Sequence, residues 1–223
     1  MKIIYTNSRY KYCMYSTDDW GNRPDLVVEI TQIINESFSK DLRTTAEKTL
    51  QLLKRHEFIL ICFNQEDQSV VGYCLLRFFL EMSLLNYSGL CVRAKNQGNL
   101  VGKKLLKLSW SYFNTSFISF TTQNPQIYHL MMILGFQLFP FDNKISKDVL
   151  QIAHFLLEDN NSNFNFDTFV FKNKYSECLY DEIPTSSNTS LDEFFGEGLG
   201  FDSKRRSKDA LLVIGKPLAK IKK

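Results

Sequence analysis

The junction between residues 90 and 103 constrains the fold of this chain more than any other segment. Residues 90–92 have the composition of a buried strand, and they lead into a polar turn that contains Gly98. A helix is predicted from Gly102 to about residue 113. A strand that passes through a glycine-containing turn directly into a helix is typical of architectures in which helices cover a sheet.

The rest of the chain alternates between helical and strand-like patterns. Two amphipathic helices are predicted first, because apolar residues recur at helical spacing. Later, Pro125 and Gly135 are expected to open and close another helix. In chain order, the predicted elements are helices at 26–38 and 45–56, strands at 58–63, 69–82 and 87–92, a helix at 102–113, a strand at 117–122, a helix from 124 and a strand after 135. The order is therefore α-α-β-β-β-α-β-α-β.

The length of the chain suggests one core with additions. A chain of 223 residues has room for one α/β domain with a sizeable core but is short for two independent ones. We expect an N-terminal segment over residues 1–24, a core over 25–140 and a C-terminal extension over 141–223. Strands are predicted at 166–171 and 209–214, and the second is apolar enough to join a sheet. The extension is therefore expected to pack on the core.

The composition argues against several classes of partner. The formal net charge is only +3, and the basic residues are dispersed, which argues against a nucleic-acid-binding protein. No stretch approaches the roughly eighteen apolar residues of a membrane span, and the beginning of the sequence lacks the apolar run of a signal peptide. We therefore expect no membrane partner and a cytoplasmic location. The sequence indicates no oligomeric state.

The cysteines point to reduced thiols rather than to disulfides or a metal site. There are five of them, an odd number, and they are scattered without the Cys/His spacing of a metal site. Cys91 lies in the strand before the turn, and no histidine stands at a telling distance from it. A buried strand thiol is therefore favoured over a nucleophile at this position.

The turn at residues 97–102 has the features of an anion-binding site. The N–H groups of the first helical turn lack internal acceptors and lie at the positive end of the helix dipole, so they suit a pyrophosphate. Gly98 and Gly102 let the main chain approach such a ligand closely, and Lys103 adds positive charge. A strand-to-helix turn that binds nothing can have the same pattern, so the loop alone leaves both interpretations open.

The same turn has a more specific spacing. Gln97 and Gly102 stand at a helix start, and residues 93–96 connect them to a strand that ends in Val92. This arrangement resembles the motif Gln/Arg-x-x-Gly-x-Gly/Ala of the GNAT superfamily, whose members are acetyl-CoA-dependent N-acetyltransferases. Leu100 departs from the motif, since it stands where the family has its first glycine. Its main-chain N–H is still available to a pyrophosphate.

A second segment resembles the same superfamily. Asn124 follows the predicted strand 117–122 and precedes a helix that closes with Gly135 and Phe136, at about the separation found in that superfamily. The resemblance covers about residues 26–140. It implies a GNAT-like acyl-CoA N-acyltransferase fold of the α/β (α+β) class, in which helices flank a mixed, mostly antiparallel sheet.

The resemblance also implies two substrates and a set of binding residues. Acetyl-CoA would be the acyl donor, and an unidentified amine, either a small molecule or a protein, would attack its thioester directly. The pantetheine would pair with the main chain of the strand before the turn, and the pyrophosphate would lie on the turn itself. The implied acetyl-CoA-binding residues are Leu90, Cys91, Val92, Gln97, Gly98, Asn99, Leu100, Val101, Gly102, Lys103 and Asn124.

Two side chains are candidates for acid–base catalysis. The superfamily often uses a glutamate on an adjacent strand as base and a tyrosine on the helix as acid. Here Met131 stands at the usual tyrosine position, and the strand before the turn has no acid. Tyr128 shares a helical face with Asn124 and is our candidate acid, with a half-buried packing residue as the alternative. Glu81, near the end of the second strand, is the candidate base, with an ordinary surface residue as the alternative.

Three functions remain open at the level of the sequence. The first is an active N-acetyltransferase. The second is a catalytically weak or inactive GNAT-like protein that binds CoA or serves as a scaffold, which Leu100 and Met131 suggest. The third is an unrelated α/β domain in which the glycine loop is only a turn.

Overall fold

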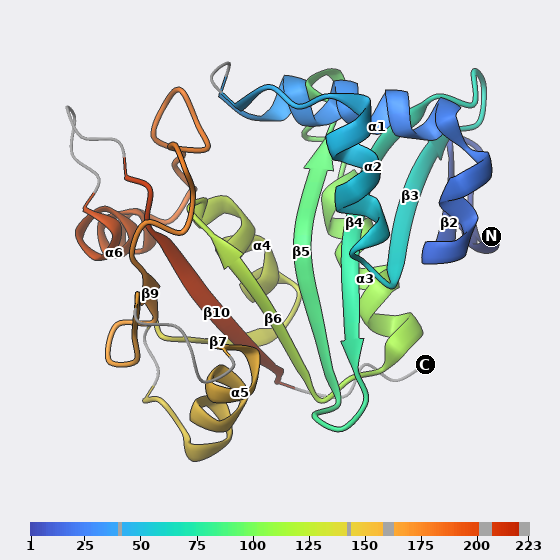
Figure 1. Cartoon of the computed structure of the whole chain (residues 1–223). Helices are drawn as coiled ribbons and strands as arrows, with labels where there is room; N and C mark the ends of the chain where they lie inside the picture. The colour runs from blue at the N-terminus through green and yellow to red at the C-terminus, as the bar shows by residue number, and fades with distance from the viewer. Residues whose placement is uncertain (40–41, 142–143, 158–162, 201–206, 219–223) are drawn as a thin grey trace. The chain divides into compact units, whose positions relative to one another are not determined.

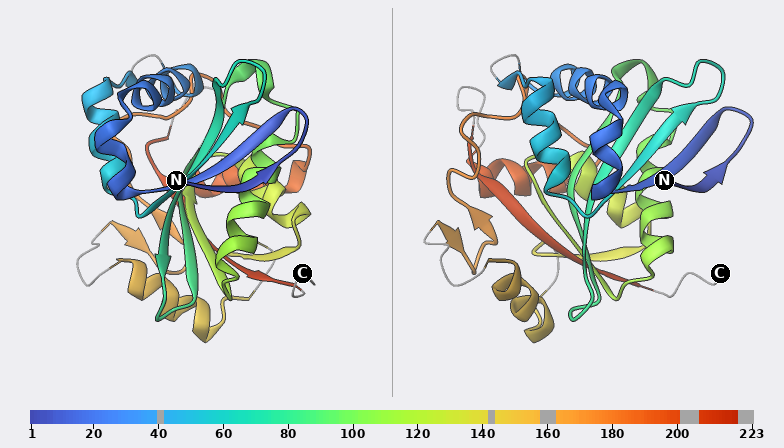
Figure 2. Two further views of the ribbon diagram at one scale, coloured as in Figure 1. Left: turned by 90° about the vertical axis from the view of Figure 1, so that its right-hand side faces the viewer. Right: turned by 45° about the vertical axis from the view of Figure 1, so that its right-hand side comes forward.

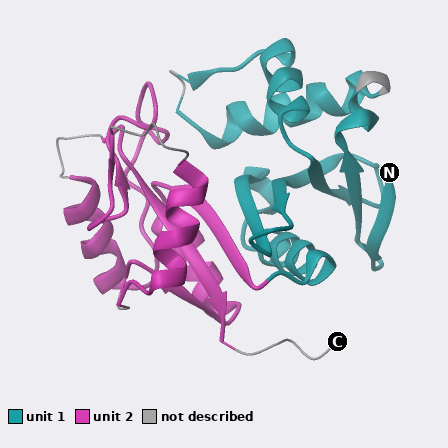
Figure 3. Ribbon diagram, turned by 60° about the horizontal axis from the view of Figure 1, so that its bottom comes forward, with its two compact units in different colours: residues 1–115 teal, residues 116–223 magenta. Residues whose placement is uncertain are grey.

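The chain forms two compact units in the computed structural model. The structure describes residues 1–39, 42–141, 144–157, 163–200 and 207–218 (Figure 1). The first unit comprises residues 1–115 and the second residues 116–223; the two are coloured separately in Figure 3. Each unit has strands and helices of its own.

The first unit is built on antiparallel strands that follow one another in chain order. Each strand pairs with the next, so the order across the sheet is β1-β2-β3-β4-β5. Short polar turns connect β1 to β2 and β3 to β4: in the second of these turns, the side chain of Asp67 accepts a hydrogen bond from the main-chain N–H of Ser69 at 2.9 Å. The strands are β1 (Lys2–Thr6), β2 (Tyr10–Ser16), β3 (Phe58–Asn64), β4 (Val70–Phe79) and β5 (Leu84–Val92).

Helices cover both faces of this sheet. On one face, α1 (Pro24–Ser37) and α2 (Ala46–Lys54) share a buried cluster with the strands, which includes Ile30, Ile61 and Tyr73. On the other face lies α3 (Val101–Phe113), as Figure 2 shows. This helix contacts β3, β4 and β5. The first seven residues of β4 are buried without interruption, because both faces of this central strand are covered.

The second unit is organised around its last strand. β10 (Ala210–Pro217) pairs antiparallel with β6 (Phe117–Thr122) along one edge, and with β7 and β9 at different points of its length. The short β8 pairs with β9. The remaining elements are α4 (Pro125–Ile133), β7 (Phe136–Phe139), α5 (Lys147–Leu157), β8 (Phe164–Asn165), β9 (Val170–Phe171) and α6 (Thr189–Leu199).

A buried glutamine joins three segments of the second unit. Gln123, directly after β6, is fully buried and donates from its side-chain amide to the main-chain oxygens of Ser207 and Asp209, at 2.9 and 2.7 Å. Its side-chain oxygen accepts from the main-chain N–H of Leu179 at 3.1 Å. Because an unsatisfied buried amide would be costly, these bonds hold the start of β10 and the segment around Leu179 at the end of β6.

The structure confirms most of the elements expected from the sequence and corrects three of them. Both N-terminal helices, the helix after the turn and the strand at 209–214 are present. The N-terminal segment holds the hairpin of β1 and β2. The predicted strand 87–92 begins earlier, at Leu84. The predicted strand 69–82 ends at Phe79. Of the predicted strand 166–171 only the last two residues form a strand, β9. Before them, the side chain of Asn165 accepts hydrogen bonds from the N–H groups of Asp167 and Thr168, which makes a turn between β8 and β9.

Within the described ranges, no helix is long and apolar enough to cross a membrane. The same residues contain no group of three or more His, Cys, Asp or Glu side chains that could hold a metal ion.

The register of β10 predicts that one glycine cannot be replaced. Gly215 lies opposite Leu138 on one side and Ile118 on the other, and an added Cβ would come within 2.6 Å of Leu138 Cδ2 and 2.7 Å of Ile118 Cγ1. We expect Gly215→Ala to lower the free energy of unfolding by about 1–3 kcal/mol through overpacking. The control is Gly198→Ala in α6, where nothing lies within 4 Å of an added Cβ. Urea denaturation should show the control unchanged or more stable, and equal losses in both variants would contradict the register.

The burial of the thiols leads to a second prediction, about their reactivity. All five cysteines are free and buried, and desolvation raises the pKa of the Cys62 thiol to about 12. Since the thiolate is the reactive form, we expect no thiol of the folded protein to react with a chromogenic disulfide reagent at pH 8, and all five to react in denaturant. A thiol that titrates rapidly in the native state would contradict the burial.

Candidate functional site

The turn between β5 and α3 has the backbone shape of an open loop. After β5 ends at Val92, a short 3-10 turn spans Ala94–Asn96 and the chain extends at Gln97. Two residues then take positive φ angles, +81° at Gly98 and +59° at Leu100. Leu100 is the N-cap of α3, so the helix begins immediately after a left-handed residue.

The beginning of α3 leaves its first amides available. The N-cap residue makes no side-chain hydrogen bond to the helix, and the first turn contains no acidic residue. At the start of the helix, the N–H of Lys104 donates to the carbonyl oxygen of Leu100 at 2.9 Å. The N–H groups of residues 101–103 therefore lie at the positive end of the helix without an intrahelical acceptor. This is the geometry that a phosphate or pyrophosphate requires.

The two lysines at this end of α3 have different surroundings. The ammonium of Lys104 lies 3.6 Å from the ring centroid of Tyr5 in β1, a cation–π contact that draws it toward the sheet edge. Lys103 is half-buried one residue earlier, beside the open amides. Of the two, Lys103 is the better placed to meet an anion at the helix start.

Leu100 occupies a conformation that favours glycine. Its φ and ψ angles of 59° and 10° lie in the left-handed region, which costs a residue with a Cβ about 1–2 kcal/mol. The side chain is 71% exposed, so burial does not compensate for this cost. The backbone at Leu100 thus has the left-handed shape that favours a glycine, and the leucine side chain points into solvent. The residues present fit a pyrophosphate on the main chain.

Gln97 has a structural role in the same loop. Its side-chain amide donates to the main-chain oxygen of Val92 at 3.1 Å, which closes the turn across five residues. Asn99 is exposed, and its N–H reaches the carbonyl oxygen of Asn96 at 3.4 Å. The predicted binding residues of the loop are therefore contiguous and held by bonds within the loop.

Arg93 fixes the loop to the rest of the first unit, and our sequence analysis missed it. Its Nε donates to the carbonyl oxygen of Val70 at 2.7 Å, and its guanidinium lies 3.0 Å from Glu36 and 3.5 Å from Glu29. Its main-chain N–H also donates to Val71 at 2.9 Å. Glu36 is 57 residues away in the sequence, so no local pattern could have indicated this pair.

The strand before the loop is irregular at one point. Leu75 of β4 lies opposite Gly89 and Leu76 lies opposite Tyr87, so Ser88 is an extra residue in β5. Such a bulge bends a strand and increases its twist, and bulges occur frequently near active sites. Beyond it, the predicted pantetheine-binding residues Leu90, Cys91 and Val92 complete the strand.

The side chain of Cys91 belongs to the core. It is part of the buried cluster beneath α1, and burial raises the pKa of its thiol. The structure thus supports the interpretation of Cys91 as a buried strand thiol. Only its main chain is available to a ligand, and this part of the assignment stays a prediction.

Glu81 is separated from the loop along β5. It is exposed in the turn between β4 and β5 rather than in a strand, so its expected position at a strand end is wrong. The loop begins at the far end of β5, and a strand of this length spans about 25–30 Å. The structure does not bring Glu81 close to the anion-binding turn, and a role as base remains untested.

The remaining predicted residues lie in the second unit, on α4. Asn124 is the N-cap of this helix: its side chain accepts from the N–H of Gln126 at 2.9 Å, and its own N–H donates to Thr122 Oγ1 at 2.8 Å. Such a cap contributes about 1 kcal/mol to helix stability, which explains an asparagine here without a ligand. Binding of acetyl-CoA by Asn124 stays a prediction.

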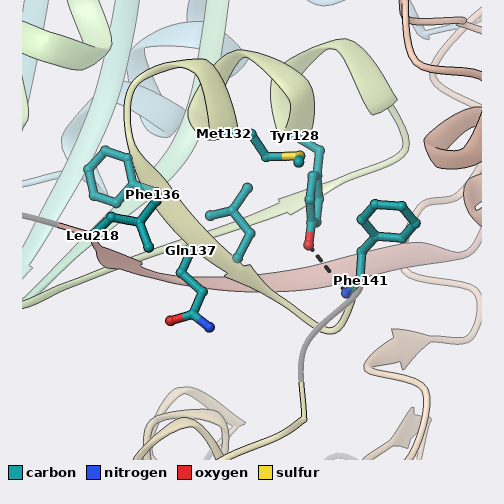
Figure 4. Close-up of a pocket in the computed structure, with 7 residues that line it drawn as sticks. Tyr128, Met132, Phe136, Gln137, Phe141 and Leu218 are labelled. Carbon is teal, nitrogen blue, oxygen red and sulfur yellow. Dashed lines mark hydrogen bonds between the residues drawn. The ribbon is translucent and has the colours of Figure 1, made fainter.

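Tyr128 has both a packing role and access to a cavity. The side chain is only 1% exposed, its ring contacts Phe141 and Phe195 edge-on, and its hydroxyl accepts from the N–H of Phe141 at 3.2 Å. Figure 4 shows this bond at the edge of a largely apolar cavity of about 260 Å³, with Met132 and Phe136 on its other walls. Met131, at the usual tyrosine position, is buried. The packing interpretation of Tyr128 gains direct support, and catalysis by it is untested.

Comparisons with known proteins find likenesses among solved structures. No protein-family model matches the sequence, and no curated protein matches it. Among solved structures, an aminoglycoside 6'-acetyltransferase type Ii aligns with 93% of this chain and 97% of its own, with a TM-score of 0.50 and 10% identity. A GNAT-family acetyltransferase from Streptococcus pneumoniae has a TM-score of 0.48, 12% identity and coverage of 93% and 99%. For GCN5 of Tetrahymena the TM-score is 0.47, with 16% identity and coverage of 63% and 85%.

The first of these likenesses extends over nearly the whole chain. It confirms that the chain has the GNAT acyltransferase fold, with helices flanking a mostly antiparallel sheet, as the sequence resemblance implied. At 10% identity the likeness extends to the fold alone. It transfers no acceptor and no catalytic residue.

The strain at Leu100 is open to a direct test. Replacing Leu100 with glycine removes the left-handed cost and adds about 0.5–1 kcal/mol of backbone entropy to the unfolded chain. We expect Leu100→Gly to raise the free energy of unfolding by about 0.5–1 kcal/mol, measured by urea denaturation. Leu100→Ala keeps the Cβ and serves as the control, which should gain nothing. A glycine variant less stable than the alanine variant would contradict the left-handed conformation.

Proposed function

We propose that this protein is an acyl-CoA-dependent N-acetyltransferase that moves an acetyl group from acetyl-CoA to an amine. One observation carries the proposal: on a GNAT fold, α3 begins with open amides after a turn with two positive φ angles. Anion binding at a helix start is a general property, but this location on this fold makes acyl-CoA the specific candidate.

The main chain would bind the donor in two places. The N–H groups of residues 101–103 would hold the pyrophosphate, with Lys103 adding charge and Gln97 keeping the turn closed. The pantetheine amides would pair with the main chain of Leu90, Cys91 and Val92 in β5. The bulge at Ser88 supports this arrangement, because it bends β5 just before these residues, which themselves pair regularly with β4.

For the transfer itself, the protein would need to align the amine with the thioester, accept one proton and donate another. The neutral amine attacks the thioester carbonyl carbon, the C–N bond forms, and the tetrahedral intermediate collapses as the C–S bond breaks. A main-chain N–H near the bulge would stabilise the negative charge on the carbonyl oxygen. The ammonium proton passes to a base, for which Glu81 is the candidate, and the departing thiolate takes a proton, for which Tyr128 is the candidate.

A catalytically weak or inactive CoA-binding module is the second candidate. Leu100 in place of the motif glycine, the buried Met131 and the use of the Tyr128 hydroxyl by Phe141 favour it. These features would impair proton transfer and the fit of acetyl-CoA, but they leave the N–H groups at the start of α3 open. Binding of the donor is therefore common to both functions, and turnover distinguishes them.

Five free cysteines support a reducing compartment, since disulfides are rare in the cytosol. We propose a cytoplasmic location on this ground.

Isothermal titration with acetyl-CoA and with CoA tests the binding step. We expect saturable binding that Gly102→Phe weakens about tenfold or more, because a ring at the second residue of α3 obstructs the approach of a pyrophosphate. Lys107→Phe places the same ring on an exposed position of α3 and is the matched control. The absence of binding at high micromolar protein, or equal affinity in both variants, would contradict the proposal.

Release of free CoA thiol distinguishes the enzyme from the binding module. The acceptors are polyamines, amino acids, aminoglycosides and lysine peptides, each mixed with acetyl-CoA and the full chain. Turnover on one of them supports the enzyme, and Tyr128→Phe should then lower kcat with little change in KM if the hydroxyl protonates the thiolate. CoA binding without turnover on any of these amines favours the module.

A further inference from the structure

One face of α1 meets the residue at which β5 gives way to the anion-binding turn. Glu29, Gln32 and Glu36 are spaced by three and four residues, so they lie on one side of this helix. All three approach the guanidinium of Arg93: Glu36 lies 3.0 Å away, and Glu29 and Gln32 each lie 3.5 Å away. Arg93 directly follows Val92, the last residue of β5. Side chains of α1 therefore reach the point where the loop begins.

The same guanidinium also bonds to the main chain of β4. Its Nε donates to the carbonyl oxygen of Val70 at 2.7 Å, and the carboxylate of Glu29 accepts from the N–H of Val70, also at 2.7 Å. Only 13% of the Arg93 side chain is exposed, and hydrogen bonds between charged groups are stronger in such surroundings than on an open surface. One network therefore joins α1, β4 and the end of β5.

The main chain of Arg93 connects this network to the shape of the loop. Its N–H donates to the carbonyl oxygen of Val71 at 2.9 Å, and its own carbonyl oxygen accepts from the N–H of Asn96 at 2.8 Å, across the 3-10 turn. The side chain of Gln97 then bonds back to the carbonyl oxygen of Val92 at 3.1 Å. Both bonds that shape the turn are thus made to Arg93 or to the residue before it, so a shift of Arg93 would displace the turn.

The affinity of the loop for an anion depends on how well its shape is held before the anion binds. The N–H groups of residues 101–103 bind one phosphate together only when they point at the same place. A loop that moves freely loses conformational entropy on binding, whereas a loop already held in the binding shape does not. The N-cap of α3 makes no side-chain bond to the helix, so the support for this shape comes from the residues before it.

From these observations we propose that α1 sets the affinity of the loop for acyl-CoA through Arg93. Glu29 and Glu36 belong neither to the loop nor to β5, and they act as positioning residues because they hold the guanidinium in place. Since such coupling is reciprocal, a bound acyl-CoA also strengthens the contact between α1 and Arg93. The inference rests on the proposed function, because acyl-CoA is its ligand, and it adds a helix that the donor site itself does not include.

Isothermal titration of the full chain with acetyl-CoA tests this inference on matched variants of α1. Glu36→Gln removes the carboxylate nearest to the Arg93 guanidinium, and we expect it to weaken acetyl-CoA binding about threefold. Asp25→Asn is the control: it removes another carboxylate of α1, one that pairs with Arg23 at 2.8 Å and not with Arg93. The control should keep the affinity of the parent protein, and circular dichroism verifies that both variants are folded.

Variants of Arg93 separate positioning from stability. Arg93→Ala should weaken acetyl-CoA binding about tenfold or more, and Arg93→Lys, which keeps the charge but not the planar fork, should recover part of that loss. If Glu36 acts through the guanidinium, Glu36→Gln should have no further effect on affinity when combined with Arg93→Ala. A loss of stability alone would not produce this result, because the affinity is measured on protein that remains folded.

Three results would overturn the inference. They are parental affinity in folded Arg93→Ala, equal losses of affinity in Glu36→Gln and Asp25→Asn, and an undiminished effect of Glu36→Gln in the Arg93→Ala background. If Arg93→Ala does not fold, the comparison of Glu36→Gln with Asp25→Asn decides alone. Absence of acetyl-CoA binding by the parent protein is a different outcome: it would overturn the proposed function, and this inference with it.

Discussion

The guanidinium of Arg93 holds the end of β5 against β4 and α1, and the shape of the loop at 97–102 depends on that anchor. It bonds to the main chain of Val70 and lies between the carboxylates of Glu29 and Glu36 with only 13% of its side chain exposed. Glu29 in turn accepts from the N–H of Val70 at 2.7 Å. Removing a partner from such a partly buried network leaves carboxylates and a carbonyl without a donor, which costs more than the bonds themselves contribute. Arg93 is thus a positioning residue for the loop.

The consequence of this anchor appears at Leu100. A chain that leaves β5 at a fixed point and must start α3 on the far face of the sheet has few residues in which to turn. It uses positive φ angles at Gly98 and at Leu100, although only the glycine lacks the Cβ that opposes this conformation. The strained leucine persists because the packing of β5 and α3 determines the path on both sides. The open amides at the start of α3 follow from the same path.

The sequence predicted the helices and strands better than it predicted the geometry of the site. The helices and central strands followed from apolar periodicity, and the turn at 97–102 from its glycines and its spacing. The left-handed state of Leu100 could not be predicted, because nothing in the local sequence distinguishes a leucine forced into it. Partners far apart in the chain were equally hidden, such as Arg93 with Glu36 and Gln123 with Ser207. The first four residues of the predicted strand 166–171 form a turn instead, because the turn-forming side chain of Asn165 outweighed the aromatic residues beside it.

The central claim is that the start of α3 binds the pyrophosphate of an acyl-CoA. The two catalytic candidates have other surroundings: the hydroxyl of Tyr128 accepts a hydrogen bond from the N–H of Phe141, and Glu81 lies in the turn before β5, at the end of the strand far from the loop. A crystal structure of the protein with acetyl-CoA tests the claim most directly. The account predicts pyrophosphate oxygens within hydrogen-bonding distance of the N–H groups of residues 101–103 and the pantetheine along β5. A donor bound elsewhere on the chain, with these amides facing only water, would contradict it.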